Sequence, residues 1–202
     1  MGNGLGEEDD GGQLRPAQVS LTASDGSGLR LVELEARAVL YGPLAFTELH
    51  LAFHNPEPRT REGTFSITLP DGAGVSRFAM RLGERWQEGE VVEREAGRAV
   101  YESFMHRRVD PALLVHDSGN VFRGRVFPIV AGEVKEIILS YTQTLAAPDA
   151  EYRIPLRGLP SLDRLGIELL VPRERKVFVL RRSGAPSRDF VHRAAPGGPS
   201  AV

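Results

Sequence analysis

The feature of this chain that most constrains its fold is the alternation of apolar and polar residues along many short segments. In FTELHLAF, residues 46–53, one parity carries Thr47, Leu49, Leu51 and Phe53, whereas the other carries Glu48, His50 and Ala52 and continues to His54. Successive side chains of a β-strand point to opposite faces, so a period of two is typical of a strand with one buried face. The chain is therefore expected to consist mainly of strands.

The same alternation recurs at regular intervals between turn residues, for example in LRLVELEARAVL, TFSITLP and LGIELLV. In EVKEIILSYTQTL, Ile137 and Tyr141 share one parity while Ile138 takes the other, which predicts either a bulge or a strand buried on both faces. About ten to twelve short strands separated by turns are typical of a β-sandwich. We therefore predict a mostly β chain that folds as an antiparallel β-sandwich.

One segment departs from this pattern. EREAGRAVYESF, residues 93–104, belongs to a stretch with apolar residues at three- and four-residue spacing, among them Ala96, Val100 and Phe104. That spacing predicts one short amphipathic α-helix, which would cover an open end of the sandwich and carry no chemistry.

The two ends of the chain differ in composition from its centre. Residues 1–15 are Gly-rich and acidic, and residues 183–202 are rich in Pro, Gly and Ala, so both are expected to be flexible. Residues 16–182 are expected to form the folded domain. No signal peptide and no apolar run of membrane-spanning length is present. If the chain is complete, it is expected to be cytoplasmic and not inserted in a membrane.

Composition excludes several functions. The chain has no cysteine, which excludes disulfides, thiolate nucleophiles and cysteine-based metal sites. A net charge of −2 argues against a nucleic-acid partner, because binding to phosphates needs a basic surface. Lys135 and Lys176 are the only lysines beside many arginines, a bias that indicates a GC-rich bacterial genome.

The order of landmarks from GEVVEREAGRAVYESF through DPALL and NVFRGRVFPI to GEVKEIILSYTQTL resembles the vault protein inter-alpha-trypsin (VIT) domain. The resemblance covers about residues 17–145 and departs from the family at Gly97, where the family usually has Ala. The residues that carry the motif, expected to be mainly structural, are Gly97, Tyr101, Asp110, Pro111, Leu114, Asn120, Phe122, Arg125, Pro128, Ile129, Gly132 and Tyr141.

The resemblance implies a β-sandwich module without known catalysis, found in inter-alpha-trypsin inhibitor heavy chains, in the vault-associated poly(ADP-ribose) polymerase and in many bacterial proteins. Such modules usually precede a von Willebrand A-type domain. It therefore implies a non-enzymatic interaction or scaffolding module, whose partner is a protein or an adjacent von Willebrand A-type domain. That domain is absent here: the nearest match to its Asp-x-Ser-x-Ser metal loop starts at Asp25, and Leu29 replaces the second Ser.

No catalytic residue, metal ligand or cofactor is expected. His50 and His54 would lie about 13 Å apart on one strand, too far to share a metal ion. His116, Asp117 and Ser118 are adjacent in sequence, so they cannot form a hydrogen-bonded triad among themselves. The candidate interaction surface follows the predicted helix and consists of Phe104, Met105, Arg107 and Arg108.

Two other functions remain open: a carbohydrate-binding β-sandwich that stacks sugars on Trp86 and Tyr101, and an enzyme of unrecognised type. An interaction module predicts an exposed apolar patch and no pocket with converging ionisable groups. Carbohydrate binding predicts an exposed Trp86 beside polar residues, whereas an enzyme predicts a deep cleft with clustered His and Glu.

Overall fold

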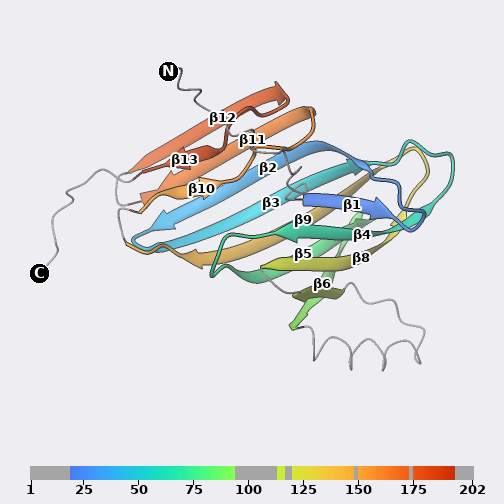
Figure 1. Cartoon of the computed structure of the whole chain (residues 1–202), viewed down its shortest axis with the longest axis horizontal. Helices are drawn as coiled ribbons and strands as arrows, with labels where there is room; N and C mark the ends of the chain where they lie inside the picture. The colour runs from blue at the N-terminus through green and yellow to red at the C-terminus, as the bar shows by residue number, and fades with distance from the viewer. Residues whose placement is uncertain (1–18, 94–112, 117–119, 148–149, 173–174, 194–202) are drawn as a thin grey trace, which may run out of the picture.

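A computed structural model of the chain describes residues 19–93, 113–116, 120–147, 150–172 and 175–193 (Figure 1). These residues form strands joined by turns, and they include no α-helix. The strands are β1 (Val19–Ala23), β2 (Arg30–Tyr41), β3 (Leu44–His54), β4 (Arg61–Thr68), β5 (Gly74–Leu82), β6 (Arg85–Glu93), β7 (Leu113–His116), β8 (Val121–Ile129), β9 (Val134–Thr144), β10 (Tyr152–Ile154), β11 (Leu162–Val171), β12 (Lys176–Gly184) and β13 (Phe190–His192).

Eleven of these strands form one continuous sheet in the order β1-β4-β8-β7-β6-β5-β9-β3-β2-β11-β12, and β10 pairs with β13 in a separate ribbon. Strand β6 joins the two halves of the large sheet. Its first part, from Arg85 to Gly89, pairs with β5, and the remainder, from Glu90 to Glu93, pairs with β7. Because one strand serves both halves, the sheet turns a corner there without being interrupted.

The prediction of a mostly β chain is confirmed, but that of an antiparallel β-sandwich with one α-helix is wrong. The large sheet is mixed, because β2 runs parallel to β11 and β6 runs parallel to β7. Alternation shows which face of a strand is buried, but it is the same in parallel and antiparallel pairs and does not identify the neighbours. The predicted helix over residues 93–104 lies, apart from Glu93, outside the described residues, and Glu93 ends strand β6.

The core is enclosed because the sheet curls over itself. Phe65 of β4 lies 6.2 Å from Phe53 of β3 and 5.9 Å from Phe78 of β5, measured between ring centroids, although β4 pairs with neither strand. All three rings are buried. The part of the sheet that contains β1, β4 and β8 therefore covers the inner face of the part that contains β5, β9, β3 and β2 (Figure 1).

The ribbon of β10 and β13 continues this cover toward β12. Tyr152 and Ile154 of β10 are buried, and the His192 ring lies 4.7 Å from that of Phe178 on β12. Strand β13 and the end of β12 fall within residues 183–202, which were expected to be tail. Phe190–His192 is a short alternating segment that pairs with β10, so the folded region extends past residue 182.

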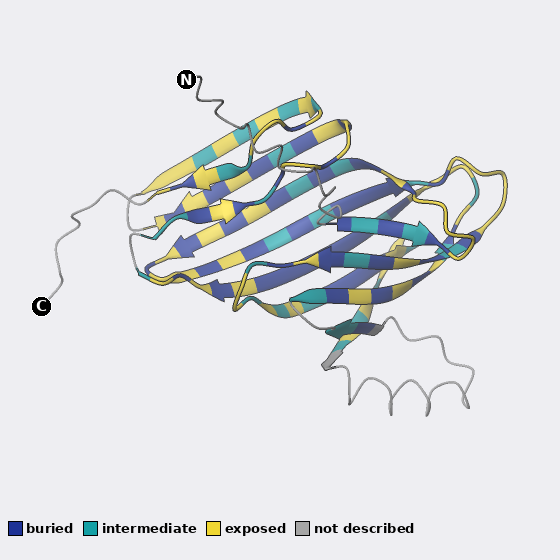
Figure 2. Cartoon of the chain, viewed as in Figure 1, coloured by how far each residue is buried: buried dark blue, intermediate teal, exposed yellow. Residues whose placement is uncertain are grey.

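Burial follows the predicted parity in the central strands (Figure 2). Thr47, Leu49, Leu51 and Phe53 are all buried on the core face of β3, as predicted. On β9, Ile138 is buried on the face opposite to Ile137, and the pairing of β9 with β3 has no register shift. Of the two alternatives, the strand buried on both faces is therefore confirmed. Among the described residues, no helix has the length and apolar character needed to cross a membrane.

Candidate functional site

The outer face of the large sheet, turned away from the core, carries an apolar row that crosses four neighbouring strands. The register aligns Val177 of β12 with Leu170 of β11, Leu170 with Val39 of β2, and Val39 with Phe46 of β3. All four side chains are exposed, from 37% for Val39 and Leu170 to 55% for Val177. Cross-strand partners on one face of a sheet are direct neighbours, so the row is continuous.

The hairpin between β2 and β3 extends this row. Tyr41 pairs with Leu44 at its tip, and their side chains are 56% and 55% exposed. We call the combined set the outer apolar patch; it consists of Val39, Tyr41, Leu44, Phe46, Leu170 and Val177. Clusters of exposed apolar and aromatic side chains are characteristic of binding surfaces, because isolated ones are common but contiguous ones are not.

Sequence reasoning did not identify the outer apolar patch. The signal was present in part, since VLYGPLAF carries apolar residues on both parities, which a strand with one solvated face does not need. The remaining members come from β11 and β12. Their position beside β2 depends on a parallel pairing that alternation does not reveal.

Beyond the patch, the outer face becomes charged. Glu48 of β3 accepts a hydrogen bond from His50 at 2.8 Å and lies 3.6 Å from Arg77, which also binds Glu88 at 2.7 Å. The hydrogen bond from His50 is the main cause that holds the pKa of Glu48 below its ordinary value, and Arg77 does the same for Glu88. These carboxylates therefore remain ionised at neutral pH.

Next to this charged region, Trp86 of β6 borders a shallow hollow of about 180 Å³. The indole is 36% exposed, the His50 ring meets it edge-on at 6.4 Å between centroids, and the Arg81 guanidinium lies 6.0 Å from its centre. The polar residues that line the hollow are Glu33, Glu35, His50, Glu136 and Arg164.

The ions around the hollow form salt bridges with one another. Arg164 forms ion pairs with Glu33 and, at 3.4 Å, with Glu35, while Arg81 binds Glu136 at 3.0 Å. The expectation that no pocket brings ionisable groups together is therefore wrong. The exposed position of Trp86 beside polar residues favours the carbohydrate alternative, and Tyr101, its proposed second platform, lies outside the described residues.

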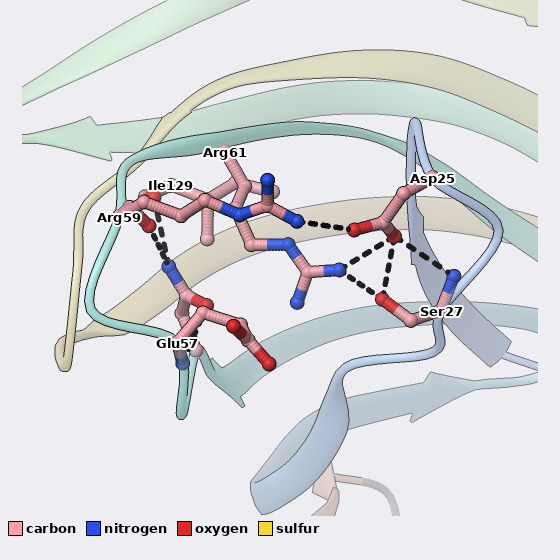
Figure 3. Close-up of polar contacts among 7 residues, drawn as sticks. Asp25, Ser27, Glu57, Arg59, Arg61 and Ile129 are labelled. Atoms are coloured by element: carbon pink, nitrogen blue, oxygen red, sulfur yellow. Dashed lines mark hydrogen bonds and ion pairs between the residues drawn. The ribbon is translucent and has the colours of Figure 1, made fainter.

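The loop that begins at Asp25, considered above as a degenerate metal loop, is tied to two arginines (Figure 3). The Asp25 carboxylate accepts hydrogen bonds from the Ser27 hydroxyl at 2.6 Å, from Arg61 at 2.7 Å and from Arg59 at 2.9 Å. These donors, above all Ser27, hold the pKa of Asp25 far below its ordinary value. Guanidinium groups thus occupy the position next to the carboxylate where a cation would bind.

In the part of the chain that the structure describes, histidine and acidic side chains do not converge in a way that suits a metal ion. Within the described ranges, no group of three or more His, Asp or Glu side chains is arranged to hold one. His116 stacks on Phe122 at 4.6 Å between ring centroids, while Asp117 and Ser118 lie outside those ranges.

Several predicted residues fall outside the described part of the chain: Gly97, Tyr101, Asp110, Pro111 and the whole candidate surface of Phe104, Met105, Arg107 and Arg108. Of the motif residues that are described, four belong to the core. Leu114, Phe122, Ile129 and Tyr141 are all buried.

The remaining motif residues shape turns or a surface pair. Asn120, with a φ of 59°, donates from its side chain to Asp71 at 2.6 Å, and its carbonyl accepts from the backbone N–H of Leu69. Gly132 has a φ of 68°, which favours glycine. Arg125 binds Glu62 through two nitrogens at 2.5 and 2.7 Å and lowers the pKa of that carboxyl. Pro128 follows a cis peptide bond.

Comparisons with known proteins match one family model and a number of solved structures. The family model described as vault protein inter-alpha-trypsin domain matches residues 31–141. No curated protein matches the chain significantly. Two crystal structures of an M1 zinc metallopeptidase mutant from Deinococcus radiodurans, one with a Tyr-Ser-Ala substrate bound, are 11% and 10% identical, each with a TM-score of 0.44. Each match covers 78% of this chain, which spans 39% of the metallopeptidase chain.

Proposed function

Because the chain belongs to the vault protein inter-alpha-trypsin domain (VIT) family, we propose that it is a non-enzymatic protein–protein interaction or scaffolding module. The resemblance expected from the sequence is confirmed by the family match over residues 31–141. Its partner is an adjacent von Willebrand A-type domain or a separate protein.

The observation that carries this proposal is the outer apolar patch. Its six side chains lie together on the solvent side of four strands, and contiguous exposed apolar patches of this kind are characteristic of interaction sites. Two of them, Tyr41 and Phe46, are aromatic, the residue class enriched in interface cores. Burial of such a row against a flat partner surface is a sufficient source of binding free energy.

The electrostatics of the outer face support a non-enzymatic role. Its carboxylates with shifted pKa values, Glu48 and Glu88, are both shifted downward by neighbouring donors. A general acid needs the opposite shift, so that it carries a proton at neutral pH.

A binding experiment tests the proposal. The full chain is immobilised and titrated with a purified von Willebrand A-type domain from a protein that also carries a VIT domain. We expect saturable binding, and a loss of about tenfold or more in affinity for the triple variant Val39→Thr, Phe46→Thr, Leu170→Thr. Threonine keeps strand propensity while it removes apolar surface.

The matched control replaces exposed apolar residues on other strands and turns, with the variant Phe127→Thr, Val130→Thr, Val134→Thr. Its affinity should equal that of the unmodified chain. If both variants weakened binding equally, the outer apolar patch would not be the specific binding surface. Absence of binding by the unmodified chain would contradict the adjacent-domain partner.

A second candidate function is carbohydrate binding, favoured by the exposed Trp86 beside polar side chains. An indole face stacks on the apolar face of a sugar ring, and Glu35 and His50 could bind its hydroxyls. Trp86 is the only tryptophan, so its fluorescence reports directly on the hollow. Titration with cellotetraose and maltotetraose should quench or shift the emission if this function is correct, and unchanged emission at millimolar sugar would exclude both glucans as ligands.

A further inference from the structure

Strand β12 forms one edge of the large sheet. Within the described residues it pairs only with β11, so the backbone groups on its other side have no strand partner there. The strand is nine residues long and contains Val177 and Val179, both exposed. A long edge strand with apolar side chains is a template onto which another strand can pair.

A groove of about 690 Å³ runs between this edge and the ribbon of β10 and β13. Its floor is apolar, because Phe178, Leu180 and Phe190 line it and are partly buried against the core. Phe178 and Leu180 are two residues apart on β12 and therefore point to the same side of the strand. In a partner strand paired with β12, every second side chain would point to this same side and could contact the apolar floor.

Positive charge surrounds this floor. Four arginines line the groove, at positions 153, 157, 182 and 188, against one carboxylate, that of Asp189. Asp189 is already engaged, since it accepts hydrogen bonds from the Arg153 side chain and from the backbone N–H groups of Leu156 and Arg157. Arg182 and Arg188 form no salt bridge with any carboxylate among the described residues.

We propose that the groove between β12 and β13 binds an extended segment of a partner protein, which adds a strand to β12 and combines apolar side chains at its centre with acidic residues at its ends. This inference rests on the proposed interaction function and adds a second surface with defined partner chemistry. Main-chain hydrogen bonds to the β12 edge hold the segment, the apolar floor takes its central side chains, and Arg182 and Arg188 pair with its carboxylates.

Fluorescence anisotropy with the full chain tests the proposal. The probe is a fluorescein-labelled decapeptide with alternating Thr and Val at its centre and two Glu at each end. We expect saturable binding that weakens about tenfold or more in the double variant Arg182→Glu, Arg188→Glu. The control variant Arg37→Glu, Arg85→Glu changes the net charge equally at exposed positions outside the groove and should bind the peptide as the unmodified chain does.

Two further peptides separate strand addition from simple charge attraction. One peptide has Lys in place of Glu, and the other has Pro at the two central positions. Both should bind at least about tenfold more weakly than the acidic peptide. Hydrogen–deuterium exchange should show slower exchange in residues 176–184 when the acidic peptide is bound. Equal binding of the Pro-containing peptide, unchanged exchange in β12, or preferential binding of a single-stranded oligothymidylate would overturn the proposal.

Val177 belongs to both surfaces, but the three residues changed in the patch variant do not line the groove, so that variant separates the two. The variant Val39→Thr, Phe46→Thr, Leu170→Thr should still bind the acidic peptide. If peptide binding fails while the von Willebrand A-type domain still binds, the groove proposal alone is wrong. If the peptide binds and the domain does not, the groove proposal stands without the adjacent-domain partner.

Discussion

The hydroxyl groups of Thr47 and Tyr152 lie 2.7 Å apart in the core, where neither side chain reaches solvent. Thr47 belongs to β3 of the large sheet and Tyr152 to β10 of the ribbon, so this hydrogen bond connects the two. Burial raises the pKa of Tyr152, which keeps its hydroxyl protonated. Burial also raises the pKa of the family-motif residue Tyr141, and a hydrogen bond with Thr47 partly offsets this.

Tyr152→Phe removes one partner of this bond and leaves the Thr47 hydroxyl to be satisfied elsewhere. We expect a loss of about 1 to 2 kcal/mol in the free energy of unfolding. Thr47→Val alone should cost at least as much, because it also removes the hydrogen-bond partner of Tyr141. Because the two residues share one interaction, the double variant should lose less than the two single losses combined. Urea denaturation of all four proteins measures this coupling, and strictly additive losses would show that the bond is absent in solution.

Lys135 is nearly fully buried on the core side of β9, and no described carboxylate forms a salt bridge with it. Its ammonium group donates a hydrogen bond to the carbonyl of Arg81 at 2.8 Å. Burial lowers the pKa of Lys135 from 10.5 to about 8. The folded state therefore loses this proton at a lower pH than the unfolded state does.

This difference predicts how stability depends on pH. Between about pH 8 and pH 10.5 the unfolded state binds more protons, so the contribution of Lys135 to the free energy of unfolding rises with pH. Lys135→Met should remove this rise and stabilise the protein at pH 7 by about 1 to 3 kcal/mol. The other lysine, exposed Lys176, provides the control Lys176→Met. The denaturation midpoint is measured at pH 7 and pH 10, and its change between the two should be the same in Lys176→Met and in the unmodified chain. The prediction would be contradicted if Lys135→Met also showed that same change.

The sequence contained enough information to predict the strands and their buried faces, because burial is a local property of an alternating pattern. Phe53 and Tyr141 are buried as their parity requires. The pairing of β2 with β11 was not predictable in this way, since about 120 residues separate the two strands and alternation carries no information on direction. The sequence therefore did not predict that Leu170 and Val39 lie side by side in one exposed row.

The groove between β12 and β13 was not predictable from the sequence for a different reason. Phe190 and His192 lie in a segment whose Pro and Gly content indicates a tail, and only their pairing with β10 makes them part of the fold. Trp86, in contrast, was a candidate from composition alone as the only tryptophan. Its exposure depends on where the pairing of β6 with β5 places the indole, and the sequence does not specify that pairing.

Gly63 of β4 is required by a close approach of two strands. A Cβ atom at this position would lie 2.7 Å from the backbone oxygen of Thr22 and 3.2 Å from Ile129. Gly63→Ala should therefore destabilise the protein by about 1 to 3 kcal/mol. Gly74→Ala is the matched control, because a Cβ there meets nothing within 4 Å and the backbone does not require glycine. It should be neutral or slightly stabilising in thermal denaturation. Equal effects of the two changes would contradict the close approach.

Asn55 connects the two loops at one end of the sheet. Its side-chain nitrogen lies 3.0 to 3.1 Å from the carbonyl oxygens of Arg59, Ile129 and Val130, and its side-chain oxygen accepts from the Glu57 backbone N–H. The residue is fully buried. The amide nitrogen has two hydrogens to donate, and the three carbonyl oxygens share them. A side chain of this size without both a donor and an acceptor group does not fit the arrangement.

Asn55→Asp keeps the shape of the side chain but replaces the donor with an oxygen that faces three carbonyl oxygens. We expect a loss of about 3 kcal/mol in the free energy of unfolding at pH 7, because the buried carboxylate keeps only the Glu57 N–H as a donor while its other oxygen faces three carbonyl oxygens. Burial should raise the pKa of the new carboxyl in the folded state, so stability is lost as pH rises and partly restored as it falls toward 4. Asn55→Ala should be destabilised as well, but by an amount that does not change with pH. Urea denaturation of both variants at pH 7 and pH 4.5 distinguishes them, and a pH-independent deficit for Asn55→Asp would show that the side chain is hydrated rather than enclosed by carbonyl groups.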